Sequence, residues 1–209
     1  MENTGSDGQD EHHHGHYAGD QPFCGFGGFV LGLTFLFGRK KDARLACDLT
    51  AVGSGDDVVD IGCGPGVALR EARRRGATCT GVDPASPMLR LGRLVSSGAI
   101  TYVEGTAEAL PLSDGSASVA WSLATAHHWA DVEQGLAEIR RVLRPEGRLL
   151  VLEHRVTPGA KGHARHGWND EGAAAFAAVC GAAGLTDAHV EQHEGRHGPA
   201  LAVLAVRPH

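Results

Sequence analysis

The sequence of 209 residues lacks the cysteine spacing that disulfide frameworks and zinc ribbons need. Its cysteines are odd in number, stand far apart and include no CxxC pair. They are Cys24, Cys47, Cys63, Cys79 and Cys180. We therefore expect reduced thiols and a cytoplasmic location.

A long hydrophobic run is also missing. The apolar stretch FCGFGGFVLGLTFLFG (23–38) is shorter than the roughly 20 residues of a membrane-spanning helix and contains five glycines. The chain does not open with a basic segment, an apolar core and a small-residue cleavage site. We expect no membrane span, and we interpret 23–38 as a segment that covers the domain or the substrate. Contact with a membrane surface stays an alternative.

An excess of basic charge is absent as well. The formal net charge is −6, whereas a protein that binds a phosphate backbone favours a basic surface. Nucleic acid is therefore not expected as a partner. Hydrophobic residues make up 42% of the chain and charged residues 21%, which is enough apolar material for one folded domain.

From residue 39 onward, strand-like and helix-like patterns alternate. Strands are predicted over 57–63, 77–83, 100–106, 119–125, 148–154, 186–194 and 200–208, and helices over 39–52, 67–76, 84–98, 131–143 and 169–184. Asn169 is the predicted N-cap of the last helix. Such alternation is typical of an α/β fold with a mostly parallel sheet, and the closing hairpin predicts an antiparallel last strand. We predict a Rossmann-like, doubly wound sheet of seven strands in residues 39–209, preceded by a flexible arm and covering segment in residues 1–38.

The segment VVDIGCGPG (58–66) places Gly62, Gly64 and Gly66 between a strand and a helix. Glycine is needed there because the backbone turns tightly and approaches a ligand closely. Asp83 ends the next strand, where a carboxylate can accept both hydroxyls of a ribose. Val67 stands where dinucleotide sites have a third glycine. The pattern thus favours a nucleoside ligand without a pyrophosphate, and a dinucleotide oxidoreductase stays an alternative.

Five segments then carry a family resemblance: VVDIGCGPG, GVDPASPML, VEGTAEALPLSDGSAS, SLATAHHWAD and EIRRVLRPEGRLLVLE. In this order they resemble the class I S-adenosylmethionine-dependent methyltransferases. Within this class the chain is similar to the small-molecule branch of the ubiquinone and menaquinone biosynthesis type (methyltransferase domain 11). The resemblance runs from about Arg39 to the end of the chain. It implies S-adenosylmethionine as the cofactor and S-adenosylhomocysteine as the product.

The resemblance also implies roles for individual residues. The glycine loop would pass beneath the methionine part of the cofactor, with Asp60 near its amino group, and Asp83 would take the ribose hydroxyls. The carbonyl of Ser122 or Leu123 would accept from the ammonium. The neighbours of the adenine would be Pro84, Met88, Thr106, Ala107 and Glu108.

The chain departs from the family pattern at three places. Thr106 stands where relatives often carry an acid, so a charge-assisted bond to the adenine amine is lost. Ser118 stands where an aspartate often precedes the fourth strand, and RPEG (144–147) replaces a Pro-Gly-Gly turn.

Methyl transfer from a sulfonium depends mainly on alignment and on exclusion of water, but an oxygen or carbon nucleophile also needs a base. Histidines that follow strand ends are the candidates, because ligands bind at the carboxyl ends of the strands. We single out His127 and His154, with His128 as a structural neighbour. The loop residues His163 and His166 are further options. A purely structural role for both adjacent histidines stays open, and no metal site is expected because metal-ligand spacing is absent.

The sequence lacks the Pro-Cys pair of cytosine-methylating enzymes and the Asn/Asp-Pro-Pro-aromatic segment of amino-methylating DNA enzymes. A small-molecule acceptor, methylated at oxygen, nitrogen or carbon, is therefore the main hypothesis. Phenylalanines of the covering segment with Trp129 and Trp168 would suit an apolar or aromatic acceptor, although they also fit an ordinary core. A protein substrate, a non-catalytic cofactor-binding partner subunit and a homodimer stay open.

Overall fold

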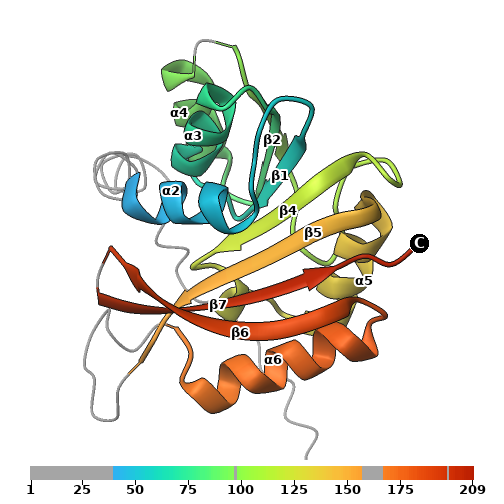
Figure 1. Cartoon of the computed structure of the whole chain (residues 1–209). Coiled ribbons are helices and arrows are strands. Elements are labelled where there is room, and N and C mark those ends of the chain that lie inside the picture. The colour runs from blue at the N-terminus through green and yellow to red at the C-terminus, as the bar shows by residue number, and fades with distance from the viewer. Residues whose placement is uncertain (1–39, 97, 157–166, 197) are drawn as a thin grey trace, which may run out of the picture.

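The computed structural model describes residues 40–96, 98–156, 167–196 and 198–209 (Figure 1). Its helices are α2 (Lys40–Leu49), α3 (Val67–Arg74), α4 (Ser86–Val95), α5 (Val132–Val142) and α6 (Asp170–Ala182), with a short 3-10 helix η1 (Ala126–His128). Its strands are β1 (Asp57–Ile61), β2 (Thr78–Asp83), β3 (Thr101–Glu104), β4 (Ala117–Leu123), β5 (Leu143–His154), β6 (Thr186–Gly195) and β7 (Gly198–Val206). The predicted arm and covering segment, together with His163 and His166, lie outside the described residues.

The seven strands form one sheet in the order β3-β2-β1-β4-β5-β7-β6. The first five strands in this order pair in parallel, and β7 runs antiparallel to both β5 and β6. The predicted α/β fold and its antiparallel closing strand are thus confirmed. The chain moves outward from β1 to β3 and then crosses back to β4 on the other side of β1. This reversal is the switch point at which open α/β sheets bind their ligands.

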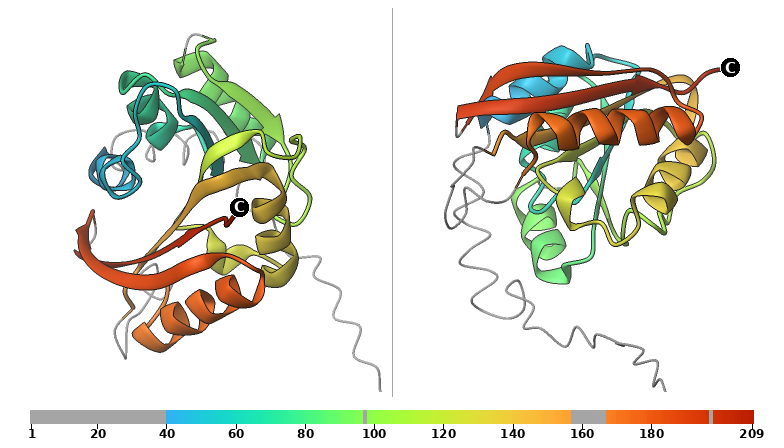
Figure 2. Two further views of the ribbon diagram at one scale, coloured as in Figure 1. Left: turned by 45° about the vertical axis from the view of Figure 1, so that its right-hand side comes forward. Right: turned by 90° about the horizontal axis from the view of Figure 1, so that it is seen from below.

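Helices α2, α3 and α4 cover one face of the sheet (Figures 1 and 2). On this face the buried Trp121 of β4 packs among apolar side chains of α2 and α3. Its indole Nε1 donates to the hydroxyl of Thr50 at 3.1 Å, and that hydroxyl donates to the carbonyl of Ala46 at 2.6 Å. Because a buried indole N–H needs an acceptor, this chain of bonds fixes the end of α2 against the middle of the sheet.

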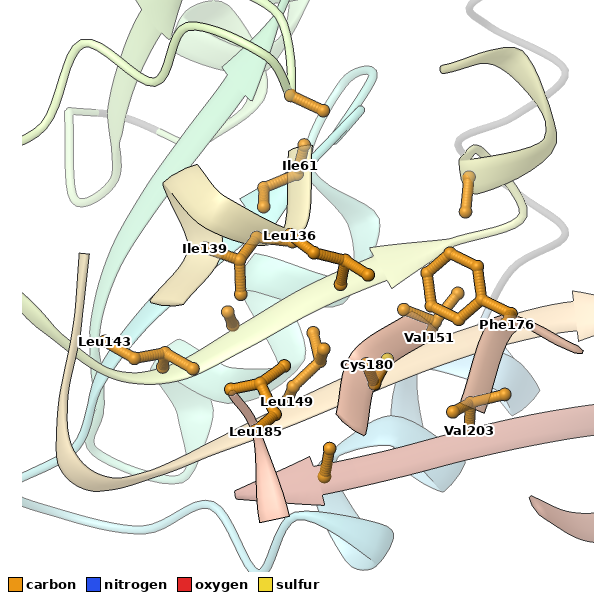
Figure 3. Close-up of a cluster of buried hydrophobic side chains, with 14 of the residues drawn as sticks. Ile61, Leu136, Ile139, Leu143, Leu149, Val151, Phe176, Cys180, Leu185 and Val203 are labelled. Atoms are coloured by element: carbon orange, nitrogen blue, oxygen red, sulfur yellow. The ribbon is translucent and has the colours of Figure 1, made fainter. Parts of the chain in front are cut away.

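Helices α5 and α6 cover the opposite face (Figure 3). Leu136 and Ile139 of α5 and Phe176 of α6 pack there on Leu149 and Val151 of β5. Leu150 and Leu152, which alternate with these two residues along β5, pack on the other face. Since successive side chains of a strand alternate between faces, Glu153 and His154 leave the end of β5 toward opposite sides.

Most element boundaries follow the sequence prediction, and the start of β5 is an exception. The strand begins at Leu143, which pairs with Ala117, whereas the prediction placed its start at 148. The RPEG turn lies within the strand as an irregularity, with Glu146 at φ 64°. The backbone N–H of Glu146 donates to the carbonyl of Arg207, the residue that follows β7, at 2.7 Å. Pairing to β7 therefore holds the turn in the sheet, a long-range contact that local sequence does not reveal.

The predicted cap of α6 is confirmed. Asn169 has an extended backbone, and its side-chain oxygen accepts from the N–H of Gly172 at 2.8 Å. Trp168 immediately before it packs on Phe176, with ring centroids 4.6 Å apart. The cap and this ring contact bring α6 onto the sheet beside the loop that follows β5.

Candidate functional site

A cavity of about 600 Å³ opens at the carboxyl ends of β1, β2, β4 and β5, at the switch point of the sheet. Of the twelve predicted cofactor residues, ten line this cavity. They are Asp60, Gly62, Gly64, Asp83, Pro84, Met88, Thr106, Ala107, Glu108 and Leu123. Gly66 and Ser122 are not part of its wall. The topology therefore brings together residues that lie up to 63 positions apart in the sequence (60 to 123).

The glycine loop after β1 has the left-handed conformation that glycine permits. Gly62, Gly64 and Gly66 have φ values of 76°, 52° and 72°. A Cβ on Gly62 would lie 2.6 Å from the hydroxyl of Thr125, and one on Gly66 would lie 2.1 Å from the hydroxyl of Tyr102. A Cβ on Gly64 would meet nothing within 4 Å. Two of the glycines thus let neighbouring elements approach, and Gly64 leaves its space to the cavity.

Asp83 joins the loop after β1 to the loop after β2. One carboxylate oxygen accepts the N–H of Gly64 at 2.8 Å, and the other accepts the N–H of Ala85 at 2.8 Å. The residue is 8% exposed. Burial raises the pKa of Asp83 above its ordinary value, and the two backbone N–H donors partly offset that rise. Asp83 is therefore a buried carboxylate at the cavity wall that also holds the glycine loop.

Thr125 ties the end of β4 to the end of β1. Its hydroxyl donates to the carbonyl of Ile61 at 2.9 Å and lies 2.8 Å from the hydroxyl of Ser122. Because a hydroxyl has only one proton, the Ser122 hydroxyl is the donor in the second bond. This bond keeps the Ser122 side chain inside the protein, where it is fully buried, while Leu123 faces the cavity. Thr125 lines the cavity too, although the sequence reasoning did not single it out.

The backbone just after β4 is strained. Ala124 lines the cavity with φ 57°, a region that residues with a Cβ rarely adopt. Its N–H donates to the carbonyl of Leu152 in β5 at 2.7 Å. The strain lies where β4 ends and η1 begins, so it sets the direction in which the following histidines leave the sheet.

On the side of β2 and β3, the wall contains Pro84, Met88 and Ala107, which are apolar as predicted. Glu108 is engaged in the protein, because its carboxylate accepts the N–H groups of Ala130 and Asp131 at 2.8 and 3.3 Å. Partial burial raises the pKa of Glu108, but hydrogen bonds from these and other donors outweigh it and lower the pKa overall. Glu108 thus links the loop after β3 to the segment before α5.

The three histidines at the ends of β4 and β5 have different surroundings. His128 and His154 line the cavity, and His127 does not. Nδ1 of His127 lies 2.9 Å from Oε2 of Glu153, and its backbone N–H is 3.3 Å from Oε1. The rings of His127 and His128 are in contact, with centroids 3.9 Å apart. The expectation that His127 rather than His128 faces the pocket does not match this arrangement, because Glu153 draws the His127 ring away.

Further residues of the cavity were not predicted as site residues. Asp42 and Ala43 come from α2, Ala200 from β7 and Glu153 from β5. Oδ1 of Asp42 accepts the N–H of Arg196 at 2.7 Å, so α2 is joined to the β6–β7 hairpin. Glu153 had a visible signal, since it is a charged residue directly after the apolar run Leu149–Leu152 of β5. Asp42 had none, because an acid in the first turn of a helix is ordinary.

Among the described residues there is no group of three or more histidine, cysteine or acidic side chains that could hold a metal ion. Likewise, no helix in the described part of the chain is long and apolar enough to cross a membrane.

Comparison with known proteins agrees with this geometry. The family described as a methyltransferase domain matches residues 59–151. The chain is 38% identical over 108 residues to the malonyl-[acyl-carrier protein] O-methyltransferase of Pseudescherichia vulneris, covering 50% of this chain and 43% of that protein. It is 34% identical over 120 residues to the demethylmenaquinone methyltransferase of Thermus thermophilus, covering 55% and 54%. The chain therefore spans about half the length of the curated relatives it matches.

The fold is shared with a solved structure of a SAM dependent methyltransferase from Aquifex aeolicus. The two chains superpose with a TM-score of 0.70 at 14% sequence identity, over 86% of this chain and 98% of the other. At this identity the likeness concerns the fold, and it agrees with the sheet order described above.

Proposed function

The chain belongs to the class I S-adenosylmethionine-dependent methyltransferases, and on this premise we propose that it transfers a methyl group from S-adenosylmethionine to a small-molecule acceptor. The observation that carries the proposal is the cavity at the switch point, where the glycine loop and Asp83 meet. The acceptor atom is an oxygen, nitrogen or carbon of an apolar or aromatic metabolite. The malonyl-[acyl-carrier protein] O-methyltransferase and the demethylmenaquinone methyltransferase are named for different acceptors, so the proposed acceptor class rests on this chain's own residues.

The residues at the β1–β2 side fit the cofactor. Gly64 leaves open space where any other residue would place a Cβ, which a methionine chain passing over the loop requires. The carboxylate of Asp60, a residue that is 3% exposed, is proposed to bind the amino group of the cofactor's methionine part. The carboxylate of Asp83 is proposed to accept from the two ribose hydroxyls. Pro84, Met88 and Ala107 offer apolar surface to the adenine, and the carbonyl of Leu123 is the proposed acceptor for the ammonium.

The bound cofactor supplies a methyl group on a sulfonium, which is already activated toward nucleophiles. The chain's task is then to align the acceptor with that methyl and to exclude water from the cavity, and both effects lower the barrier substantially. Leu123, Leu152 and Ala200 form apolar parts of the wall near the ends of β4, β5 and β7. These residues hold the acceptor side of the cavity dry and fixed.

An acceptor that loses a proton during transfer needs a base within hydrogen-bond reach. His154 and His128 line the cavity at the ends of β5 and η1, so these two imidazoles are the proposed candidates. His127, predicted from its place at the strand end, is proposed to act on its neighbours instead, because its Nδ1 is engaged by Glu153. A thiolate or free-amine acceptor would need neither base.

Calorimetry of the full chain with S-adenosylmethionine and with S-adenosylhomocysteine tests the proposal, followed by turnover of a panel of phenols, amines, thiols and quinols. Binding of both nucleosides and methylation of one panel class are expected. Failure of both to bind would sink the proposal. Binding of NAD in their place would favour an oxidoreductase.

Two alternative functions can be separated in the same way. Binding of the cofactor without turnover of any small molecule would favour a non-catalytic partner subunit. Transfer of labelled methyl to proteins, with none to the small-molecule panel, would favour a protein methyltransferase.

The cellular location is part of the proposal. The four cysteines within the described residues are free and buried, and burial raises the pKa of Cys47, Cys79 and Cys180 to about 12. Such thiols stay protonated and unreactive, which suits a reducing compartment. We propose that the protein is located in the cytoplasm. The boundary between an arm (1–38) and a methyltransferase domain (39–209) stays a prediction, as does a homodimer.

A further inference from the structure

Glu153 is a carboxylate that the fold buries almost completely beside the cavity. It precedes the last residue of β5 and is 1% exposed. Within the described residues, its carboxylate is hydrogen-bonded by one residue at two points: the backbone N of His127 lies 3.3 Å from Oε1, and Nδ1 of His127 lies 2.9 Å from Oε2. A buried carboxylate is destabilising unless donors meet it. This two-point contact therefore ties η1 to the end of β5.

The contact also decides where the ring proton of His127 lies. An ionised carboxylate has only acceptor atoms, so the Nδ1 that faces it carries the proton. In the neutral imidazole the other nitrogen, Nε2, is then the basic one. Because the same carboxylate holds both the backbone and the ring of His127, the ring has little freedom to turn.

His127 in turn contacts the histidine that lines the cavity. The ring centroids of His127 and His128 are 3.9 Å apart, and the ring planes meet at 47°. A series of contacts thus runs from the buried Glu153 through His127 to His128 at the cavity wall. The strained backbone of Ala124 lies two residues before η1, where the chain leaves β4.

We propose that Glu153 is a positioning residue for the reaction: by holding His127 at two points, it sets the ring of His128 against the acceptor. Glu153 acts through its neighbours and not on the acceptor itself. The inference rests on the proposed function, because it assigns His128 to the acceptor side of the methyl-transfer cavity.

The test is NMR of the histidine rings in the full chain, compared between the native sequence, Glu153→Gln and Glu191→Gln. Glutamine keeps the shape of the side chain but offers one acceptor oxygen in place of two. Glu191 is the control, because its carboxylate also contacts imidazole nitrogens, here those of two residues: Nε2 of His189 at 3.3 Å and Nε2 of His193 at 2.7 Å. It lies on β6 and is not part of the cavity wall.

In Glu153→Gln we expect the Cε1–H signal of His128 to split into two or more signals, because the ring is no longer held in one orientation. In Glu191→Gln the His128 signal should not change. A single Cε1–H signal of His128 in Glu153→Gln, unshifted from the native chain, would overturn the proposal, because the ring would then keep its place without the carboxylate.

A second measurement holds even where Glu153→Gln fails to fold. In the native chain, ¹⁵N shifts report which ring nitrogen of His127 carries the proton. The proposal expects the proton on Nδ1 near neutral pH, and a proton on Nε2 with a bare Nδ1 would overturn it.

Binding of S-adenosylhomocysteine, measured by calorimetry in the same samples, separates this inference from the proposed function. We expect Glu153→Gln to bind it within twofold of the native chain, because Glu153 ends β5, and β4 separates β5 from β1 and its glycine loop. Lack of binding by the native chain would remove the proposed function, and the ring measurements would still report whether Glu153 orients His127 and His128.

Discussion

The two sides of the cavity are built in different ways. On the side proposed for the cofactor, around the ends of β1 and β2, the wall includes main chain held at positive φ, with Asp83 accepting from two backbone N–H groups. On the side proposed for the acceptor, the wall includes residues of α2, η1, β5 and β7. There the fixed points are contacts between side chains, above all the pair of Glu153 and His127.

This difference teaches which side of the cavity defines the family. A backbone cradle depends on glycines and a carboxylate at set spacing, so few substitutions leave its shape unchanged. A wall of side chains changes with each substitution while the cradle stays. Variants on the cofactor side are therefore expected to change cofactor affinity, and variants on the acceptor side to change turnover alone.

The largest effect is expected for Gly66→Ala. A Cβ there would lie 2.1 Å from the Tyr102 hydroxyl, at a φ of 72°. Left-handed strain of about 1–2 kcal/mol and overpacking of about 1–3 kcal/mol should lower the free energy of unfolding by about 2–5 kcal/mol. Thermal unfolding measures it. Gly55→Ala, with φ 94° and nothing within 4 Å of its Cβ, is the control and should lose only the strain term. Equal losses in both would refute the close approach of β3.

Asp83→Ala should weaken binding of S-adenosylhomocysteine by about 1.5–3 kcal/mol, roughly 10- to 150-fold, because hydrogen bonds to a charged group are of this size. Asp42→Ala is the matched control. Asp42 also lines the cavity and also accepts a backbone N–H, but it lies on the acceptor side. Calorimetry should find its affinity unchanged. A similar loss of affinity in the two variants would contradict the proposal that the two sides of the cavity bind different ligands.

Gly64→Ala should weaken cofactor binding by about 1–3 kcal/mol through overpacking of the cradle, with only the strain of a positive φ on stability. Gly115→Ala is matched to it, since both glycines have similar φ values (52° and 59°) and open space around a Cβ. The two variants should unfold at similar temperatures, and only Gly64→Ala should lose affinity. Retained affinity would mean that the cofactor does not pass over Gly64.

The smallest effect concerns pH. The folded pKa of Asp83 is raised by burial, so protonation stabilises the native state as the pH falls, and this gain is lost as the pH rises through the folded pKa. Ribose hydroxyls donate to the ionised form, so cofactor affinity should fall severalfold on acidification through the same window.

Asp83→Asn should flatten both profiles, and Asp42→Asn should leave them as they are. Thermal unfolding over a pH series measures the stability profile, and calorimetric titration with S-adenosylhomocysteine over the same series measures the affinity profile. An unchanged affinity profile in Asp83→Asn would assign the acid limb to another group.

The fold and the place of the glycine loop and Asp83 at the cavity could be predicted because their signals are local. The alternation of elements, the glycines of VVDIGCGPG and the position of Asp83 at the end of a strand can all be seen in short windows of sequence. Their consequences, a parallel sheet and a loop at its switch point, follow from general geometry.

The acceptor side could not be predicted in this way. Thr125 meets Ile61 because β1 and β4 are neighbours, and Glu153 meets His127 because β5 lies beside β4. Adjacent histidines in a sequence give no sign of which ring a distant carboxylate will draw aside. That choice is made by strand alternation and burial in the folded sheet, and it reversed the expected places of His127 and His128.

The central claim is that the backbone cradle between β1 and β2 holds the cofactor while the acceptor side holds the histidines. A crystal structure of the full chain with S-adenosylhomocysteine tests it most directly. The account predicts both ribose hydroxyls within hydrogen-bond distance of Asp83, the methionine chain over Gly64, and the sulfur facing the part of the cavity lined by His128 and His154. A nucleoside bound elsewhere, or with its ribose away from Asp83, would contradict it.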